Sequence, residues 1–135
     1  MQRKTAEATR ELSQLDRVVS KSLPARDPVK AQLYLQIASF NPDNATRLMP
    51  SPGAVLPAPV SIEQVAATAQ KVPMLFLVGS EDVLQPPAIV RAAAGMVPGS
   101  QFALVPDSGH SVYFEQPDVF NFEVGRFLTS VLSRE

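Results

Sequence analysis

The sequence contains no cysteine and a single histidine, His110, among its 135 residues. Without cysteine, the chain can have neither a disulfide framework nor a thiolate metal site, and its composition says nothing about redox compartment. One histidine without a second histidine or a cysteine provides no set of zinc ligands. We therefore expect no metal site in this chain.

The sequence also lacks an excess charge and a long apolar run. Lys and Arg total 12 against 13 for Asp and Glu, and no basic block suggests a nucleic acid or an anionic membrane as partner. The longest apolar run lies within Val72–Val78, far too short to cross a bilayer, and the residues after Met1 do not resemble a secretory signal. We expect a soluble, cytoplasmic protein of one-domain size.

The first fifty residues are predicted to be helical. Apolar residues recur at helical intervals between charged ones from Ala6 to Leu23, which predicts one amphipathic helix that Pro24 ends. Asp27 followed by Pro28 is a favoured start for the next helix. Its apolar residues continue at helix spacing, namely Val29, Leu33, Ile37 and Phe40.

A proline-rich stretch separates this region from the rest of the chain. The ten residues from Pro50 to Pro59 include four prolines and a glycine, which excludes regular structure. We place a connector at residues 51–60, between a helical cap-like segment at residues 1–50 and an α/β portion at residues 61–135.

The α/β portion alternates helices with two apolar strands. Ser61 and Gln64 have the spacing of a capping box, and the run ending at Val78 is typical of a strand covered on both faces. Two parallel strands joined by a helix are expected. The elements in chain order are a helix from Ser61 to about Gln70, a strand at Val72–Val78, a helix beginning at Pro87, a strand at Gln101–Val105 and a final helix beginning at Pro117.

Each strand is followed by a glycine-containing turn with one titratable residue, first Asp82 and then His110. Taken singly, an aspartate often caps a turn and a histidine often lies in a surface loop. Because both follow parallel strands, we expect them side by side at the same end of the sheet. The carboxylate would then accept a hydrogen bond from one imidazole nitrogen and leave the other free as a base.

The residues from about Val72 to Leu132 resemble the C-terminal half of the α/β-hydrolase superfamily. The matching pattern consists of Pro73, Gly79, Asp82, Pro86 and Pro98, then Gly109-His110-Ser111, then Glu115, Pro117, Phe120-Asn121, Val124 and Phe127-Leu128. The helical front resembles, more loosely, the cap domain of this superfamily. The resemblance implies a partial α/β-hydrolase fold, with two parallel strands, flanking helices and a helical cap-like N-terminal segment.

The resemblance also implies roles for individual residues. Asp82 matches the triad acid and His110 the general base, while Glu115, Pro117 and Phe120-Asn121 match positions that orient the last helix behind the histidine loop. Val83 and Leu84 beside the acid, and Val112 beside the histidine, are candidates for substrate contact. Tyr34 and Phe40 are further candidates from the cap side, with Leu33, Ile37 and Met49, although apolar residues at helical spacing are more often plain packing.

The chain departs from the superfamily in one important respect, because it contains no G-x-S-x-G nucleophile elbow. Ser80, Ser108 and Ser111 lie on the acid turn or the histidine loop and are poor candidates for the nucleophile. An isolated pair of strands would also leave an apolar sheet edge without a partner. We expect a fragment or one half of a split assembly, which self-associates or pairs with a chain carrying the N-terminal half.

The leading hypothesis is the acid/base half of a serine hydrolase that acts on an ester, a lactone or a carbon–carbon bond next to a ketone. Such chemistry requires no cofactor. The alternative is a non-catalytic binding or assembly module that uses the exposed sheet edge to pair with another chain. A small flavodoxin-like domain is a weaker third hypothesis, since it needs more βα units than the sequence provides.

Overall fold

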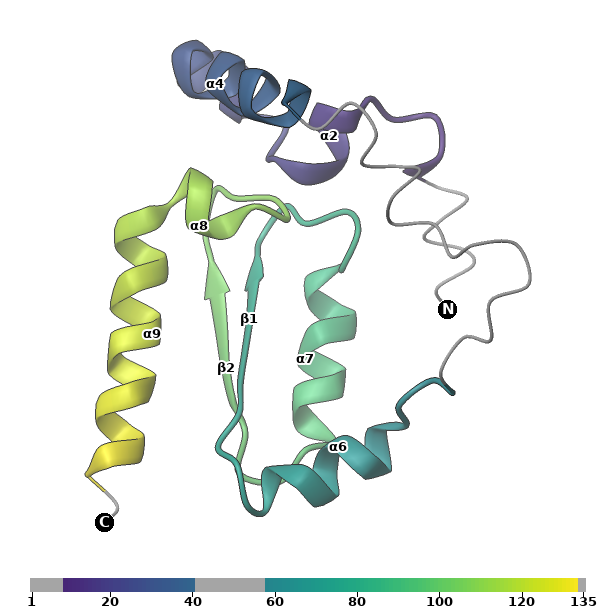
Figure 1. The fold of residues 1–135 in the computed structure, drawn as a ribbon, viewed down its shortest axis with the longest axis vertical. Helices are drawn as coiled ribbons and strands as arrows, with labels where there is room; N and C mark the ends of the chain where they lie inside the picture. Colours follow the sequence, from purple (N-terminus) through teal and green to yellow (C-terminus); the bar gives the residue numbers. More distant parts are fainter. Residues whose placement is uncertain (1–8, 41–57, 134–135) are drawn as a thin grey trace.

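A computed structural model describes residues 9–40 and 58–133, and Figure 1 shows their arrangement. Met49 and most of the predicted connector lie outside these ranges. We call residues 9–40 the front segment and residues 58–133 the back unit. The front segment contains α2 (Gln14–Val18), α3 (Leu23–Arg26) and α4 (Pro28–Ser39). The back unit contains α6 (Ile62–Ala69), β1 (Leu75–Gly79), α7 (Pro87–Gly95), β2 (Gln101–Val105), α8 (Val112–Glu115) and α9 (Pro117–Leu132).

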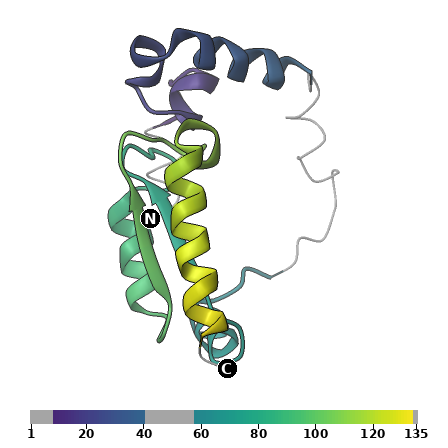
Figure 2. The same cartoon turned by 90° about the vertical axis from the view of Figure 1, so that its left-hand side faces the viewer.

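The two strands pair in parallel, with Leu75 opposite Gln101 and Gly79 opposite Val105. Helix α7 makes the crossover between them and covers one face of the sheet, while α9 covers the other (Figures 1 and 2). This is the predicted arrangement of two parallel strands with flanking helices. The carboxyl ends of both strands therefore lie at the same end of the sheet, close to the front segment (Figure 1).

The predicted signals at helix starts are present in the back unit. Ser61 Oγ accepts from the Gln64 amide at 3.3 Å, and Gln64 Oε1 accepts from the Ser61 amide at 2.8 Å, which completes the capping box. Pro87 and Pro117 begin α7 and α9, where a missing N–H costs nothing. Gly99 has a φ of 77°, which suits the turn after α7.

Strand β1 begins later than the sequence predicts. The Val72 amide donates to Thr68 O at 3.0 Å, so Val72 still belongs to the last turn after α6. Pro73 has no N–H to donate. Pairing with β2 begins where Gln101 N donates to Met74 O at 2.9 Å.

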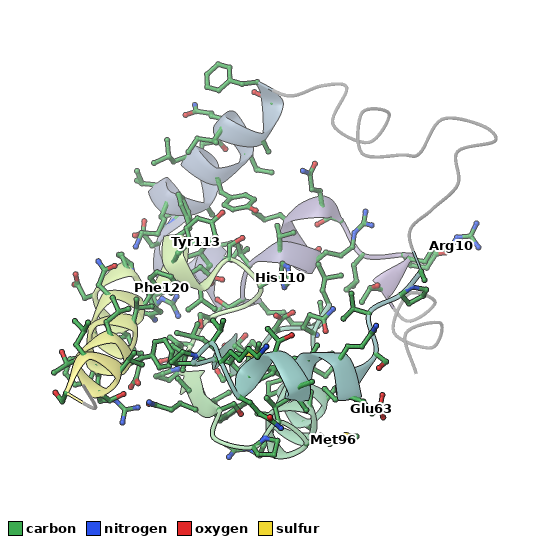
Figure 3. The ribbon with its side chains drawn as sticks, turned by 60° about the horizontal axis from the view of Figure 1, so that its bottom comes forward. Arg10, Glu63, Met96, His110, Tyr113 and Phe120 are labelled. Carbon is green, nitrogen blue, oxygen red and sulfur yellow. The ribbon has the colours of Figure 1, made fainter. Side chains whose placement is uncertain are left out.

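The core of the back unit lies between the sheet and its two helices. Val78, Ala103 and Val105 of the strands are at most 5% exposed, as are Val97 after α7 and Val112 of α8. Tyr113 of α8 packs edge to face against Phe120 of α9, with ring centroids 6.5 Å apart (Figure 3). Met96, which follows the last residue of α7, is 58% exposed (Figure 3).

The prediction of one helix from Ala6 to Leu23 is wrong for the residues that the structure describes. Helix α2 covers only Gln14–Val18, and Pro24 lies in the first turn of α3 instead of ending a helix. The helix is interrupted because its backbone groups bind elsewhere. Val18 O accepts from Ser111 N at 2.8 Å, and Ser20 N donates to Glu115 Oε2 at 2.9 Å.

Helix α4 has its predicted start but an unexpected orientation. Asp27 is the N-cap and its Oδ1 accepts from the Lys30 amide at 2.8 Å. The side that faces inward carries Ala31 and Tyr34, which pack with Val19 and Leu23 in a small core. The apolar face expected from the spacing is exposed, with Val29 78%, Leu33 46%, Ile37 51% and Phe40 81% accessible.

No helix in the described parts of the chain has the length and hydropathy needed to cross a membrane.

Candidate active site

Asp82 lies in a turn directly after β1 and is 6% exposed. Its Oδ1 accepts from the amides of Leu84 at 2.9 Å and Gln85 at 2.8 Å, and its own amide donates to Gly79 O at 3.2 Å. An aspartate that accepts from amides two and three residues ahead closes its own turn. These bonds hold Oδ1 in place and leave Oδ2 for another partner.

The histidine loop, residues 106–111, follows β2 and lies directly against the acid turn. Glu81 N donates to Ser108 O at 2.9 Å, and Ser80 N donates to Val105 O at 2.8 Å. A Cβ added at Gly79 would lie 2.2 Å from Gly109 O and 2.3 Å from Ser108 O. Glycine at position 79 therefore allows the backbones of the two turns to touch.

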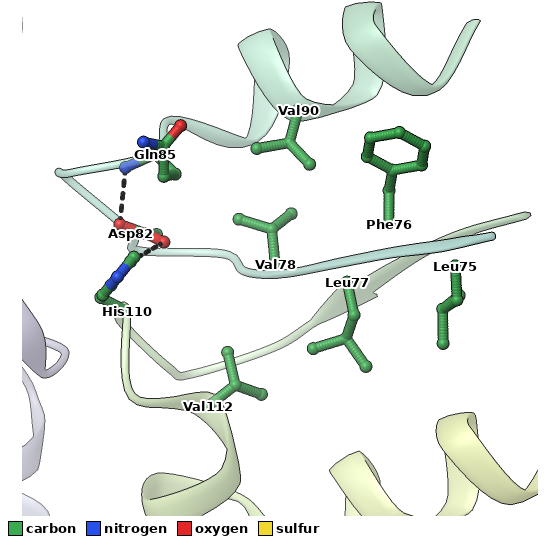
Figure 4. Close-up of a pocket in the computed structure, with 9 residues that line it drawn as sticks. All are labelled: Leu75, Phe76, Leu77, Val78, Asp82, Gln85, Val90, His110 and Val112. Carbon is green, nitrogen blue, oxygen red and sulfur yellow. Dashed lines mark hydrogen bonds and ion pairs between the residues drawn. The ribbon is translucent and has the colours of Figure 1, made fainter. Parts of the chain in front are cut away.

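The two turns bring Asp82 and His110 into contact, as the sequence pattern predicts. His110 Nδ1 lies 2.9 Å from Asp82 Oδ2 (Figure 4). An ionised carboxylate only accepts, so Nδ1 carries the proton in this bond and Nε2 of the neutral ring is free to accept one. The His110 side chain is 45% exposed, whereas that of Asp82 is 4% exposed. An oriented imidazole with a free, accessible nitrogen is the geometry of a general base.

A pocket of about 300 Å³ runs from this pair along β1 (Figure 4). In Figure 4 the side chains of Phe76 and Val78 point toward α7, while Leu75 and Leu77 point toward the opposite face of the sheet. The pocket is thus mostly apolar, with the Asp82–His110 pair at one end. Its lining residues are Leu75, Phe76, Leu77, Val78, Asp82, Gln85, Val90, His110 and Val112.

The predicted substrate-contact residues are spread over different surroundings. Val112 lines the pocket, whereas Val83 and Leu84 are half-buried on the acid turn and are not among its lining residues. Tyr34 contacts the histidine loop, because its hydroxyl lies 3.0 Å from Ser111 Oγ. Phe40 follows the end of α4 and is 81% exposed. Substrate contact by any of them remains a prediction.

None of the three candidate serines is bound to the imidazole. Ser108 is fully buried, and its hydroxyl donates to Val105 O at 3.0 Å. Ser111 is 4% exposed, and its hydroxyl is hydrogen-bonded to that of Tyr34. Ser80 is exposed beside the acid turn. In the described ranges, the hydrogen bond that His110 makes through its ring is the one to Asp82.

Two features of the site are absent from the sequence-based prediction. Gln85 and Val90 line the pocket, and Gln85 binds Asp82 through its backbone amide, so its side-chain type gives no sequence signal. Ser20 binds Glu115 across 95 residues, a distance at which no local pattern gives a signal. Among the described residues, no group of three or more His, Asp or Glu side chains could hold a metal ion.

No model of a known protein family matches the chain. A Mycobacterium tuberculosis protein named as a non-heme bromoperoxidase, BpoC, is 34% identical over 59 residues, which are 44% of this chain and 22% of that protein.

Solved structures match nearly the whole chain. A thermophilic esterase from Thermogutta terrifontis matches with a TM-score of 0.72 and 26% identity over 96% of this chain and 49% of its own. The structure of BpoC matches with a TM-score of 0.66 and 23% identity over 94% of this chain and 46% of its own. Est816, described as an N-acyl homoserine lactone degrading enzyme, matches with a TM-score of 0.65 and 20% identity over 94% of this chain and 52% of its own.

The chain therefore spans about half the length of the solved structures that it matches. It has the fold of the C-terminal half of an α/β-hydrolase, as the sequence pattern predicts.

Proposed function

We propose, from the fold of an α/β-hydrolase C-terminal half, that this chain supplies the acid and the base of a serine hydrolase. The observation that carries the proposal is the 2.9 Å contact between His110 Nδ1 and Asp82 Oδ2 at the end of the sheet. The esterase and the acyl homoserine lactone degrading enzyme that share the fold support this class of chemistry. Ester, lactone or ketone-adjacent carbon–carbon bonds are the proposed targets.

In the completed site, His110 Nε2 accepts the proton of a serine hydroxyl while the serine oxygen attacks the substrate carbonyl carbon. Asp82 keeps the proton on Nδ1 and stabilises the imidazolium that forms. His110 then donates the proton to the leaving group, and a water molecule repeats the sequence to release the acid product. The serine comes from the N-terminal half of the fold, and no cofactor takes part.

Two parts of the molecule are assigned to substrate. At the His110 end of the pocket, the apolar side chain of Val112 suits contact with an acyl or carbonyl compound, whereas the walls formed by β1 lie along the edge that is assigned below to the N-terminal half. The front segment lies over the end of the sheet that carries the pair (Figure 1), and this placement supports our proposal that it is part of a cap. We assign residues 1–50 to this cap, with Tyr34 and Phe40 as its candidate contacts, and we place Val83 and Leu84 at the rim.

The edge of β1 that faces away from β2 is the proposed docking site for the N-terminal half. Gln101 N donates to Met74 O, and Ser80 N donates to Val105 O, so alternate residues of β1 face β2. The intervening residues Leu75 and Leu77 present their N–H and C=O groups to the other edge. In the described part of the chain, β1 pairs with β2 alone. An apolar strand with a free edge can accept another strand.

The first test is to find the N-terminal half and measure hydrolysis. The three reading frames upstream of the gene are searched for a G-x-S-x-G segment, and the encoded half is produced with this chain. Hydrolysis of 4-nitrophenyl acetate is expected from the combination, and His110→Ala should reduce kcat by at least about 10³-fold. Glu123→Gln is the control and should keep full activity, because Glu123 lies on α9 and does not line the pocket of Asp82 and His110.

Four results would contradict parts of this proposal or the expected self-association. Full activity in the His110→Ala combination would refute the role of His110. His110-dependent hydrolysis by the 135-residue chain alone would show that its nucleophile lies within it. A stable complex without hydrolysis would favour the second candidate, a binding or assembly module, which the free edge of β1 supports. Size-exclusion chromatography that shows a stable monomer would count against self-association through this edge.

A further inference from the structure

A buried carboxylate joins the front segment to the histidine loop. Glu115, the last residue of α8, is 3% exposed. Its Oε1 accepts from the Gly109 amide at 2.7 Å. Its Oε2 accepts from the Ser20 amide at 2.9 Å and from the Ser20 hydroxyl at 2.6 Å. One side chain therefore binds two segments that are far apart in the sequence.

The burial of this carboxylate needs an explanation, since a charge removed from water is costly unless its oxygens find donors. Both oxygens of Glu115 are satisfied, and no buried side-chain N or O atom among the described residues lacks a partner. Bonds to a charged acceptor are stronger than neutral ones. The three donors make Glu115 a bridge between Ser20 and Gly109.

The backbones at this junction are in close contact. A Cβ added at Gly109 would lie 2.4 Å from Val19 C and 2.7 Å from Ser20 N. Ser111 N donates to Val18 O at 2.8 Å, on the far side of His110 from Gly109. The histidine loop thus lies between the acid turn and the front segment, and Figure 3 shows His110 at this junction.

Gly109 directly precedes His110, and its amide belongs to the Ser108–Gly109 peptide, so its bond to Glu115 holds the backbone one peptide unit before the histidine. Asp82 holds the imidazole ring, and Glu115 holds the chain that leads into the residue carrying that ring. Neither contact alone determines where Nε2 lies. A shift of the loop would have to stretch either the Asp82 bond or the Glu115 bond.

We propose that Glu115 is a positioning residue for His110, and that the bridge from Ser20 through Glu115 to Gly109 couples the placement of the front segment to that of the imidazole. The effect on catalysis rests on the function proposed above. The effect on the position of the imidazole ring is independent of that function, because the contacts of Glu115 are present without a substrate or a nucleophile.

The test uses the single histidine as a reporter. In the full chain labelled with ¹⁵N-histidine, the two ring nitrogens give one pair of signals, which report the proton on Nδ1 and its bond to Asp82. Glu115→Gln keeps the shape of the side chain but turns one acceptor into an NH₂ group that faces an N–H donor. We expect the bonded Nδ1–H signature to weaken, and the amides of Gly109 and Ser20 to exchange at least about tenfold faster.

The matched control is Glu123→Gln, which removes the same charge from an exposed pair with Arg126 on α9. It should leave the ring signals and both amides unchanged. Ser20→Ala removes the hydroxyl donor and keeps the amide, so a smaller change in the same direction is expected at His110. This variant also provides the test if Glu115→Gln fails to fold.

An unchanged ring signature in folded Glu115→Gln, or in Ser20→Ala where the first variant does not fold, would overturn the proposal, because a residue that serves stability alone would leave the imidazole in place. In the completed enzyme, Glu115→Gln should lower kcat with little change in KM. If the wild-type combination is inactive while the ring signature still responds to Glu115, the proposed function fails and the positioning role stands.

Discussion

The back unit is held together by strand pairing and apolar packing, whereas the front segment is attached to it largely by backbone and polar contacts. In the back unit, Val78 and Val105 are almost completely buried between the sheet and its helices. The front segment instead meets the back unit through bonds such as Ser20 to Glu115 of α8 and Arg26 to Asp107 O of the histidine loop. The apolar face of α4 remains exposed. A repeating apolar pattern thus indicates which residues share a face, but burial requires a partner for that face.

The largest expected effects come from the two glycines at which backbones touch. Gly109→Ala would push the front segment off the histidine loop, and Gly79→Ala would separate the two turns within the back unit. Each substitution should lower the free energy of unfolding by on the order of 3 kcal/mol, because the atoms that the new Cβ meets are backbone atoms, which cannot rotate out of the way as a side chain can. Gly125→Ala is the control, since nothing lies within 4 Å of its added Cβ.

Alanine at position 125 should stabilise α9 by about 0.5–1 kcal/mol, the usual gain for replacing glycine within a helix. Urea unfolding followed by circular dichroism measures all three variants. If Gly109→Ala costs less than Gly79→Ala by more than about 2 kcal/mol, the front segment is packed more loosely than the back unit.

An effect of similar size is expected inside the front segment itself. Leu23 is 1% exposed, so Leu23→Ala should cost about 3 kcal/mol through lost contacts and a cavity. Leu33 is 46% exposed on the free face of α4, and Leu33→Ala should cost less than about 0.5 kcal/mol. The two variants remove the same atoms, so the difference between their unfolding free energies measures the difference in burial. Equal costs would mean that another molecule covers the α4 face, which size-exclusion chromatography would detect.

The smallest effects are expected at the helix caps, one in each region. Asp27→Ala and Ser61→Ala should each cost about 1 kcal/mol, because each removes an acceptor for a first-turn amide. Ser61 also donates to Glu63, and this bond, followed by one to its own backbone, lowers the pKa of Glu63. Ser61→Ala should raise that pKa toward the ordinary value, as carboxyl NMR titration would show. An unchanged Glu63 pKa would contradict the hydrogen bond.

The sign of this pH effect follows from the direction of the shift. A carboxyl whose pKa is lowered in the folded chain contributes stability above its unfolded pKa, and the contribution is lost as the pH falls through the folded pKa. The wild-type protein and Ser61→Ala should therefore differ least in strong acid. Asp27→Ala leaves Glu63 unchanged and is the control for this comparison.

The parts of the molecule that the sequence predicts are those built from local signals. The capping box of Ser61 and Gln64 and the two strands with their crossover helix depend on residues close together in the chain. Asp82 and His110 are 28 residues apart, yet parallel pairing brings them to the same sheet end, so their contact follows from the fold class. The later start of β1 reflects Pro73, a local effect that the prediction overlooked.

The parts that were not predicted depend on distant contacts. The helix expected before Leu23 is interrupted because Val18 O and Ser20 N bind residues 111 and 115, which no local pattern reveals. The bridging role of Glu115 is hidden for the same reason. The orientation of α4 could not be predicted either, since its helical spacing is regular while its inward face carries only Ala31 and Tyr34.

The separation of 95 residues between Ser20 and Glu115 also has a consequence for biosynthesis. Chains are made from the N-terminus at about 5–20 residues per second, so Ser20 precedes its partner by roughly 5–20 s. During that interval the front segment has only its own small core around Leu23, and the apolar face of α4 is open to solvent and to other chains. The front segment thus lacks its bond to Glu115 until nearly all of the back unit up to the end of α8 has been synthesised.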